Sequence, residues 1–149
     1  MPETGVIAVV CDASVVLKWF HSAGESEVSA ARAILAAQRE GRVYACILDL
    51  TLYEVGNILL RKGWPAGAVG DQLDDLRALC SVIAPTETEH RLAAQIGRDS
   101  RLTYYDAAYA AVARSRGAAL ATDDPVLLRA GLWESPVALA NRLRLAGSI

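Results

Sequence analysis

The stretch VIAVVCDAS, Val6 to Ser14, is an apolar run that ends abruptly in an acid and a serine. β-Branched residues dominate its first six positions, and short runs of this kind form strands that are buried in a parallel sheet. Asp12 and Ser14 are residue types that begin helices, because their side-chain oxygens accept the free N–H groups of the first turn. The stretch therefore predicts a buried strand followed directly by a short helix over ASVVLKWF.

The same alternation of strand and helix continues along the chain. Further strands are predicted at VYACI, SVIAP and AALAT, with a weak one near 135–139. Helical patterns separate them, at about 25–40, 50–63, 64–80, 87–100, 104–116 and 125–130. Strands separated by helices indicate a three-layer α/β/α sandwich with a central, mostly parallel sheet, and residues 1–149 fit one such domain. In these folds ligands bind beyond the carboxyl ends of the strands, where the strand order reverses.

Composition narrows the class of protein. Hydrophobic residues make up 53% of the chain and charged residues 21%, which indicates a globular protein and not a disordered one. No apolar run is long enough to span a bilayer, and the N-terminal run lacks the features of a signal peptide. A net charge of -2 argues against broad electrostatic adhesion to nucleic acid, but not against an enzyme that handles it locally. We expect a soluble, cytoplasmic protein without a membrane partner.

The cysteines do not form a recognisable metal or disulfide pattern. Cys11, Cys46 and Cys80 are widely spaced among apolar neighbours, and the only histidines are His21 and His90. We therefore expect buried free thiols in a reducing compartment.

Several acids stand out, and three of them have an ordinary explanation as helix caps. Asp12 suits the first position of a helix, and so does Asp124 directly before Pro125. Asp106 lies three residues after Thr103, a spacing that resembles a capping box. Taken singly, each of these acids is explained by local structure.

Glu54 has two competing explanations. It shares a narrow helical stripe with Asn57 and Arg61, which a solvated surface would explain. The apolar residues around it instead predict a mostly buried helix, in which a carboxylate needs a partner or a cation. The tyrosines at 104, 105 and 109 are open to two uses as well, as core residues or as stacking faces for bases, and we expect core.

Local explanations do not account for the joint placement of the four acids. In a parallel sheet, Asp12 and Asp124 both follow strand ends, while Glu54 and Asp106 belong to helices that reach the same rim. Four carboxylates that converge without a nearby lysine repel one another and raise one another's pKa values. Mg²⁺ or Mn²⁺, which prefer oxygen ligands, would relieve this repulsion.

Four segments, in order and spacing, resemble the motifs of PIN-domain ribonucleases, specifically the small VapC-type toxins of bacterial toxin–antitoxin pairs: CDASVVLKWF, YEVGNILLR, LTYYDAAYAAVA and LATDDPVLLRAG. Together they cover nearly the whole chain. The resemblance implies a metal-dependent ribonuclease site, a homodimer and a small antitoxin partner. The site acids that it implies are Asp12, Glu54, Asp106 and Asp124.

The resemblance also assigns supporting positions. The family's Thr-x-Asp motif maps to Thr122 and Asp124, which leaves Asp123 in the variable place, outward or as an additional acid at the rim. Ser14 matches a recurring hydroxyl position. Pro125, directly after the fourth acid, is a mild departure that should stiffen the turn.

The mechanism expected from these residues is hydrolysis of RNA phosphodiester bonds with one or two Mg²⁺ or Mn²⁺ ions. Asp12 would be the central ligand, and Asp106 and Asp124 would complete the site directly or through water. Glu54 would bind metal or orient the attacking water. Asn57 would hold a ligand, contact substrate or make a structural hydrogen bond.

Two other classes of phosphoryl-transfer domain need residues that this sequence lacks at the matching positions. A phospho-acceptor domain normally needs a lysine at the end of the last strand, and neither Lys18 nor Lys62 is near that position in the sequence. Phosphoryl hydrolases of the Asp-x-Asp type need an acid where this chain has Ser14. A catalytically weak PIN domain that acts as a binding module, and a chromosomal ribonuclease without an antitoxin, stay open.

Overall fold

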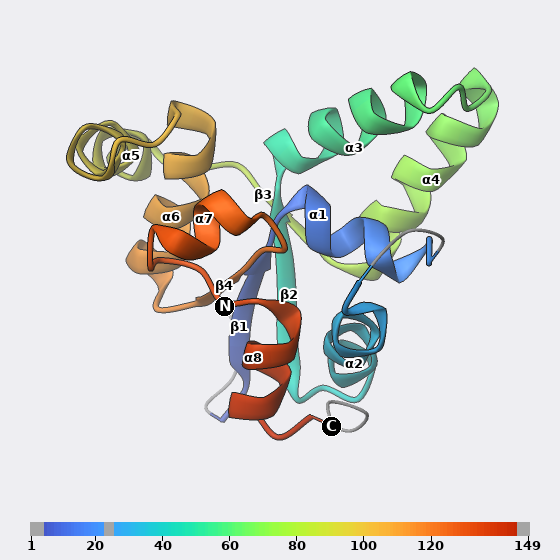
Figure 1. Ribbon diagram of the computed structural model, residues 1–149, viewed down its shortest axis with the longest axis horizontal. Coiled ribbons are helices and arrows are strands. Elements are labelled where there is room, and N and C mark those ends of the chain that lie inside the picture. The colour runs from blue at the N-terminus through green and yellow to red at the C-terminus, as the bar shows by residue number, and fades with distance from the viewer. Residues whose placement is uncertain (1–4, 23–25, 146–149) are drawn as a thin grey trace.

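The computed structural model describes residues 5–22 and 26–145, and its centre is a four-stranded parallel sheet covered by helices on both faces (Figure 1). The order across the sheet is β3-β2-β1-β4. The strands are β1 (Ile7–Cys11), β2 (Val43–Leu48), β3 (Ser81–Ile83) and β4 (Ala119–Ala121). The predicted three-layer α/β/α fold is confirmed.

The strand order reverses beside β1. This strand lies between β2 and β4, with Val9 opposite Ala45 on one side and Ala119 on the other. The chain moves outward from β1 through β2 to β3 and then returns to the other side of β1 to form β4. Asp12 follows β1 and Asp124 follows β4, so both acids lie at the point where such folds bind ligands.

Side chains that alternate along β1 contribute to two separate cores. Val9 and Cys11 pack in one core, while Val10 packs in the other. The first core is covered by α1 (Ala13–Val16), the 3₁₀ helix η1 (Leu17–Trp19), α2 (Val28–Arg39), α3 (Asp49–Arg61), α4 (Ala66–Leu79) and α8 (Pro136–Arg142). The second is covered by α5 (Glu87–Ser100), α6 (Tyr104–Arg116) and α7 (Pro125–Arg129).

Two general expectations can be compared with this structure. All three cysteines are buried and free, as expected. Within residues 5–22 and 26–145, no helix combines the length and apolarity that a membrane span requires.

The weak strand predicted near 135–139 is wrong, because this segment begins helix α8. The Ser135 hydroxyl accepts the N–H of Ala138, and Pro136 holds the first helical position. Glu134, just before the helix, forms a single parallel bridge with Ala121. The predicted helix over 13–20 divides into α1 and η1, and the expected start of the next helix at Glu25 lies outside the described residues.

The expectation that the helix around Glu54 is mostly buried is also wrong. Helices α3 and α4 form a hairpin that projects from one end of the sheet (Figure 1). Helix α3 buries Thr51, Val55 and Leu59. In contrast, Tyr53 is 77% exposed and Leu60 is 58% exposed. The apolar residues of α3 therefore form a narrow buried edge and leave large side chains on the surface.

Candidate active site

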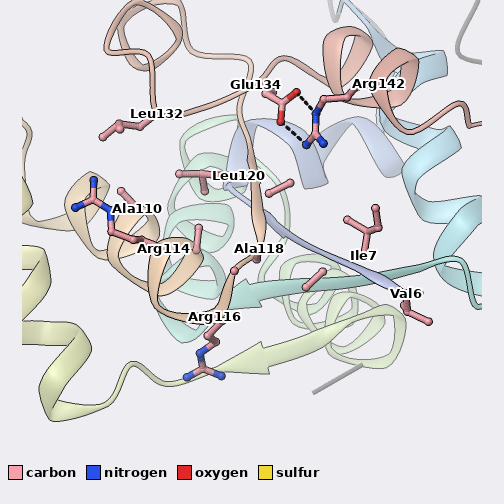
Figure 2. Close-up of a pocket in the computed structure, with 14 residues that line it drawn as sticks. Val6, Ile7, Ala110, Arg114, Arg116, Ala118, Leu120, Leu132, Glu134 and Arg142 are labelled. Atoms are coloured by element: carbon pink, nitrogen blue, oxygen red, sulfur yellow. Dashed lines mark hydrogen bonds and ion pairs between the residues drawn. The ribbon is translucent and has the colours of Figure 1, made fainter. Parts of the chain in front are cut away.

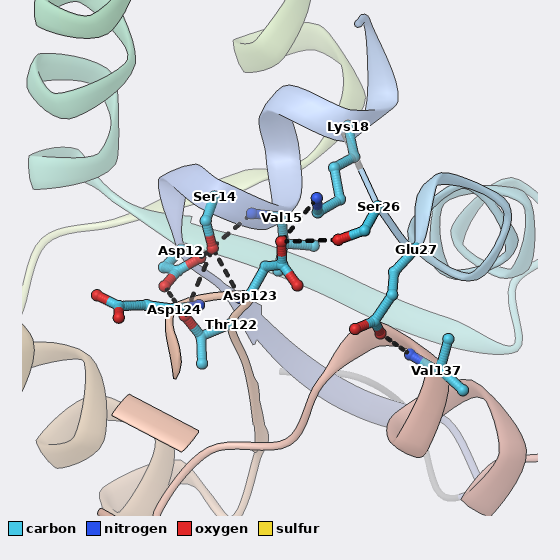
Figure 3. A network of polar contacts seen from close by, with 10 residues as sticks. All are labelled: Asp12, Ser14, Val15, Lys18, Ser26, Glu27, Thr122, Asp123, Asp124 and Val137. Atoms are coloured by element: carbon cyan, nitrogen blue, oxygen red, sulfur yellow. Dashed lines mark hydrogen bonds and ion pairs between the residues drawn. The ribbon is translucent and has the colours of Figure 1, made fainter. Parts of the chain in front are cut away.

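Asp12 is the buried centre of a network of hydroxyl groups (Figure 3). Its carboxylate accepts hydrogen bonds from Ser14 Oγ at 2.6 Å, from Thr122 Oγ1, and from the backbone N–H of Val15 at 3.2 Å. Burial raises the pKa of Asp12 to about 6, although these hydrogen bonds oppose the rise. Asp12 therefore caps α1, as its sequence context predicts, and is also held at the end of the central strand as a poorly solvated carboxylate.

The same two hydroxyl side chains fix the turn after β4. Ser14 Oγ accepts the backbone N–H of Asp123 at 2.8 Å, and Thr122 Oγ1 accepts that of Asp124 at 3.1 Å. Asp124 Oδ1 in turn accepts the N–H of Val126 at 2.9 Å, so the predicted cap of α7 is confirmed. The carboxylates of Asp123 and Asp124 point in different directions from this turn, as expected (Figure 3).

Asp123 is paired with a lysine whose position the sequence analysis missed. Lys18 Nζ lies 2.9 Å from Asp123 Oδ2, and the Lys18 side chain is fully buried. Ser26 Oγ lies 3.5 Å from the same carboxylate oxygen. The expectation that no lysine lies near the acids is therefore wrong, although Lys18 belongs to η1 and not to the end of the last strand. The available signal was a single charge within the apolar run VVLKWF, since a buried charge must be paired.

Tyr109 connects Glu54 to the core and is a second residue whose role the sequence analysis missed. Its hydroxyl donates to Glu54 Oε1 at 2.5 Å and lies 2.6 Å from Thr51 Oγ1. Tyr109 is 1% exposed, so its predicted use as a core residue is confirmed, whereas Tyr104 and Tyr105 are exposed and the same prediction is wrong for them. The signal for its role was its place three residues after Asp106, which puts both on one side of α6.

Electrostatic repulsion links the four acids. Burial raises the pKa of Glu54, and the charges of Asp12 and Asp106 raise it further, against the hydrogen bond from Tyr109. Burial also raises the pKa of Asp106, and the charge of Asp124 adds to this rise. The expected rise in pKa among converging carboxylates is therefore met at Glu54 and Asp106, whereas burial alone raises the pKa of Asp12.

The donor atoms suit a hard divalent cation, but they are not gathered into a metal cage. All four acids offer carboxylate oxygens, which Mg²⁺ and Mn²⁺ prefer. In the part of the chain that the structure describes, no group of three or more His, Cys, Asp or Glu side chains is placed to hold a metal ion. Asn57 is exposed on α3 and forms no hydrogen bond with the other described site residues. The structure therefore brings the acids within electrostatic reach of one another and leaves Asn57 apart.

A cavity elsewhere in the fold does not coincide with these acids. It has a volume of about 640 Å³ and lies at the opposite ends of β1 and β4, where none of the four acids lines it (Figure 2). Two of its arginines are already engaged, Arg116 with Glu89 at 2.9 Å and Arg142 with Glu134 at 2.7 Å. The candidate site is therefore the acidic rim and not this cavity.

Comparisons with known proteins agree with the fold. The family model described as PIN domain matches residues 9–131. The crystal structure of PAE2754 from Pyrobaculum aerophilum has a TM-score of 0.68 and 26% identity, over 95% of this chain and 97% of that one. The crystal structure of Mycobacterium tuberculosis VapC20, a toxin that cleaves the sarcin–ricin loop, has a TM-score of 0.63 and 21% identity, over 83% and 95%. No curated protein sequence matches this chain.

Proposed function

Because the chain belongs to the PIN domain family, we propose that it is a metal-dependent ribonuclease that hydrolyses phosphodiester bonds in RNA. The observation that carries this proposal is the buried Asp12, whose pKa is raised to about 6 at the point where the strand order reverses. The charges of Asp12 and Asp106 raise the pKa of Glu54, and the charge of Asp124 raises that of Asp106. Such a group of carboxylates destabilises a fold unless a cation offsets the repulsion.

The residues proposed to hold the cation are Asp12, Asp106 and Asp124, with Asp12 as the central ligand. A bound Mg²⁺ or Mn²⁺ lowers the pKa of water and offsets negative charge on the phosphate. Ser14 and Thr122 fix the orientation of the Asp12 carboxylate through their hydrogen bonds. Both hydroxyls also hold the turn that carries Asp124, so the positions of Asp12 and Asp124 are fixed relative to each other.

Glu54 is proposed as the group that positions and deprotonates the attacking water. Tyr109 occupies its Oε1, which leaves Oε2 to accept a proton. Burial and the neighbouring negative charges raise the pKa of Glu54, which makes its carboxylate a stronger base. The hydroxyl of Tyr109, anchored by Thr51, holds the side chain in this orientation.

A direct test is the cleavage of RNA with and without Mg²⁺ by the purified protein and its Asp12→Asn and Asp124→Asn variants. We expect both variants to lose 100-fold or more of the activity, on the order of the loss of one essential electrostatic group. Asp71→Asn, the same chemical change at an exposed acid on α4, is the matched control and should retain full activity. Full activity of Asp12→Asn in a clean preparation contradicts the proposal. The target is identified by sequencing RNA ends after controlled expression. Expression of Asp12→Asn is the inactive control.

We further propose that the protein is the toxin of a toxin–antitoxin pair and acts as a homodimer in the cytoplasm. The motif resemblance supports this, and so does the structural similarity to VapC20, itself a toxin. A small open reading frame directly upstream, and a small protein that co-purifies, are the expected observations. A protein that has neither and does not arrest growth when expressed is instead a ribonuclease without an antitoxin. Sedimentation equilibrium tests the dimer.

The second candidate function is a PIN domain that binds RNA without cleaving it. One observation favours it, because the acids in the described ranges are not assembled into a metal site. Calorimetric titration with Mn²⁺ separates the two functions. The nuclease binds Mn²⁺ and loses this binding in Asp12→Asn, whereas the binding module takes up no metal.

A further inference from the structure

A pocket walled by tyrosines lies beside the acids and has no role in the proposed chemistry. Its volume is about 250 Å³, and it opens where the start of α3 meets α5 and the start of α6. Its walls include Tyr53, Tyr104 and Tyr105, which are 77%, 44% and 62% exposed. Three large aromatic side chains gathered in this way on a surface mark a binding site more often than a structural need.

One of these rings is held rigidly in place. The Tyr104 hydroxyl lies 2.6 Å from His90 Nδ1 and 3.2 Å from the His90 carbonyl oxygen, to which it donates. The two rings are stacked, with centroids 5.9 Å apart and an interplanar angle of 4°. Pro85, in the loop before α5, also lines the pocket, and its ring restricts the backbone there. The pocket is therefore formed before any ligand arrives, which lowers the entropic cost of binding a flat ring.

The pocket also offers hydrogen-bond acceptors at its edge. Leu48, Leu50 and Ala108 give it an apolar lining, while Asp49 places a carboxylate beside them. Asp49 Oδ1 accepts the N–H of Leu50 at 2.9 Å, so Oδ2 is left for a ligand. Aromatic walls with a carboxylate at the edge match a nucleobase with an exocyclic amino group, which stacks by its faces and donates from its edge.

The pocket is lined by the two helices that carry Glu54 and Asp106. On α3, Tyr53 lines the pocket and the next residue is Glu54. On α6, Tyr105 lines the pocket and the next residue is Asp106. A base in the pocket therefore lies next to the helix segments that carry Glu54 and Asp106.

We propose that this tyrosine pocket is a nucleobase subsite, which binds one unstacked base next to the phosphodiester bond that is cleaved. The inference rests on the proposed ribonuclease function, and it adds a specificity element to it. Cytosine fits better than uracil, because its amino group donates to Asp49 where uracil presents a carbonyl oxygen. A protein partner or a second copy of the chain on the same tyrosines is the competing occupant.

The test uses free nucleosides, because their binding is independent of cleavage. Amide spectra of ¹⁵N-labelled protein in EDTA are recorded during titration with cytidine, with uridine and with ribose alone. We expect cytidine to shift the amides of Tyr53, Tyr104 and Tyr105, uridine to shift them less, and ribose to leave them unchanged. Tyr105→Ala should weaken cytidine binding about five- to 150-fold, the range for loss of one base–aromatic stack, and Tyr105→Phe should retain it. Asp49→Asn should reduce the preference for cytidine over uridine.

Controls separate this inference from the proposed function. Leu60→Ala truncates another exposed apolar residue of α3 and should leave cytidine binding unchanged. Asp12→Asn should abolish cleavage and keep cytidine binding, while full cleavage by this variant would overturn the function alone. If cytidine causes no shift in a protein that cleaves RNA, the subsite is overturned and the function stands. If Tyr105→Ala leaves cytidine binding unchanged but converts a dimer to a monomer in sedimentation, the pocket is a protein interface and the subsite is overturned.

Discussion

Asp12 and Glu89 are two buried carboxylates in the same fold with opposite properties. Glu89 is 2% exposed and accepts two hydrogen bonds from the Arg116 guanidinium, each at 2.9 Å. This arginine lowers the pKa of Glu89 to about 2. Asp12 is 7% exposed, is held by hydroxyls and one N–H, and forms no ion pair with a described basic residue, so its pKa rises to about 6. Both carboxylates are buried, and the groups that each one contacts decide whether its pKa rises or falls.

The comparison separates a structural acid from one proposed to bind a cation. Glu89 completes a capping box with Thr86 and ties α5 to the end of α6, so its charge is fully used within the fold. Asp12 has a charge that the fold does not neutralise, which is the condition for binding an external cation. Asp123 is paired with buried Lys18 and is therefore a structural acid like Glu89, although it lies beside Asp12.

The largest expected effect comes from removing the cation that pairs with Asp123. Lys18→Met keeps the length of the buried side chain and leaves Asp123 without its partner, so we expect a loss of about 3 kcal/mol in the free energy of unfolding. Urea denaturation measures it. The only other lysine, Lys62, is exposed, and Lys62→Met should change stability by less than about 0.5 kcal/mol. Equal stability of the two variants would contradict the structural role of the pair.

Glu89→Gln should lower the free energy of unfolding by about 2 kcal/mol, because Arg116 loses its charged partner. The pKa of Glu89 is depressed from 4.5 to about 2, so its contribution is complete above pH 4.5 and is lost as the pH falls toward 2. The wild-type protein should therefore lose stability in this window more steeply than Glu89→Gln. Glu87→Gln, at the exposed pair with Arg91, serves as the control and should have little effect.

Asp12→Asn should have the opposite effect on stability. In metal-free protein at pH 8 it should raise the free energy of unfolding by about 1–2 kcal/mol. Ionised Asp12 costs stability above its folded pKa of about 6, and this cost disappears as the pH falls below the ordinary aspartate pKa of 3.8. The advantage of the variant should shrink across that window, as thermal unfolding at several pH values would reveal. Added Mg²⁺ should stabilise the wild type and not the variant. If the variant is less stable than the wild type at every pH, Asp12 is a structural acid like Glu89.

The smallest effect is expected for Tyr109→Phe, at about 1 kcal/mol, since one buried hydroxyl is removed from Glu54 and Thr51. The Tyr109 hydrogen bond lowers the pKa of Glu54, so its loss should raise that pKa further. Carboxyl ¹³C titration of metal-free protein measures the change. A Glu54 pKa that stays the same or falls in Tyr109→Phe would show that the hydroxyl does not stabilise the carboxylate.

The strands and most helices were predictable because each rests on local signals. Helices α5 and α6 have the predicted bounds, since Thr86 and Thr103 cap them at recognisable spacing. The helix after Glu134 was not predicted, because a short apolar run fits strand and helix alike. The local signal for this helix is the cap at Ser135. The exposure of α3 depends on where the α3–α4 hairpin lies in space, which its own periodicity does not contain.

The residues of the candidate site also fall into those that local signals reveal and those that they do not. The acids were visible because each lies at the end of a strand or in a helix that reaches the rim. Their partners were not, since Tyr109 meets Glu54 across 55 positions of sequence and Lys18 lies more than 100 positions before Asp123. Such long-range contacts follow from the packing of α3, α6 and η1, and no local pattern encodes them.

The hydrogen bond between Thr122 and Asp12 joins residues 110 positions apart, and this separation matters during translation. A nascent chain that has left the ribosome as far as α5 already contains Asp12 and Glu54, but β4 and the turn with Asp124 have not emerged. Domains fold as units during synthesis, and distant strand pairings form late. The growing chain therefore carries only part of the proposed site past the ribosome's own RNA and completes it only when synthesis is almost finished.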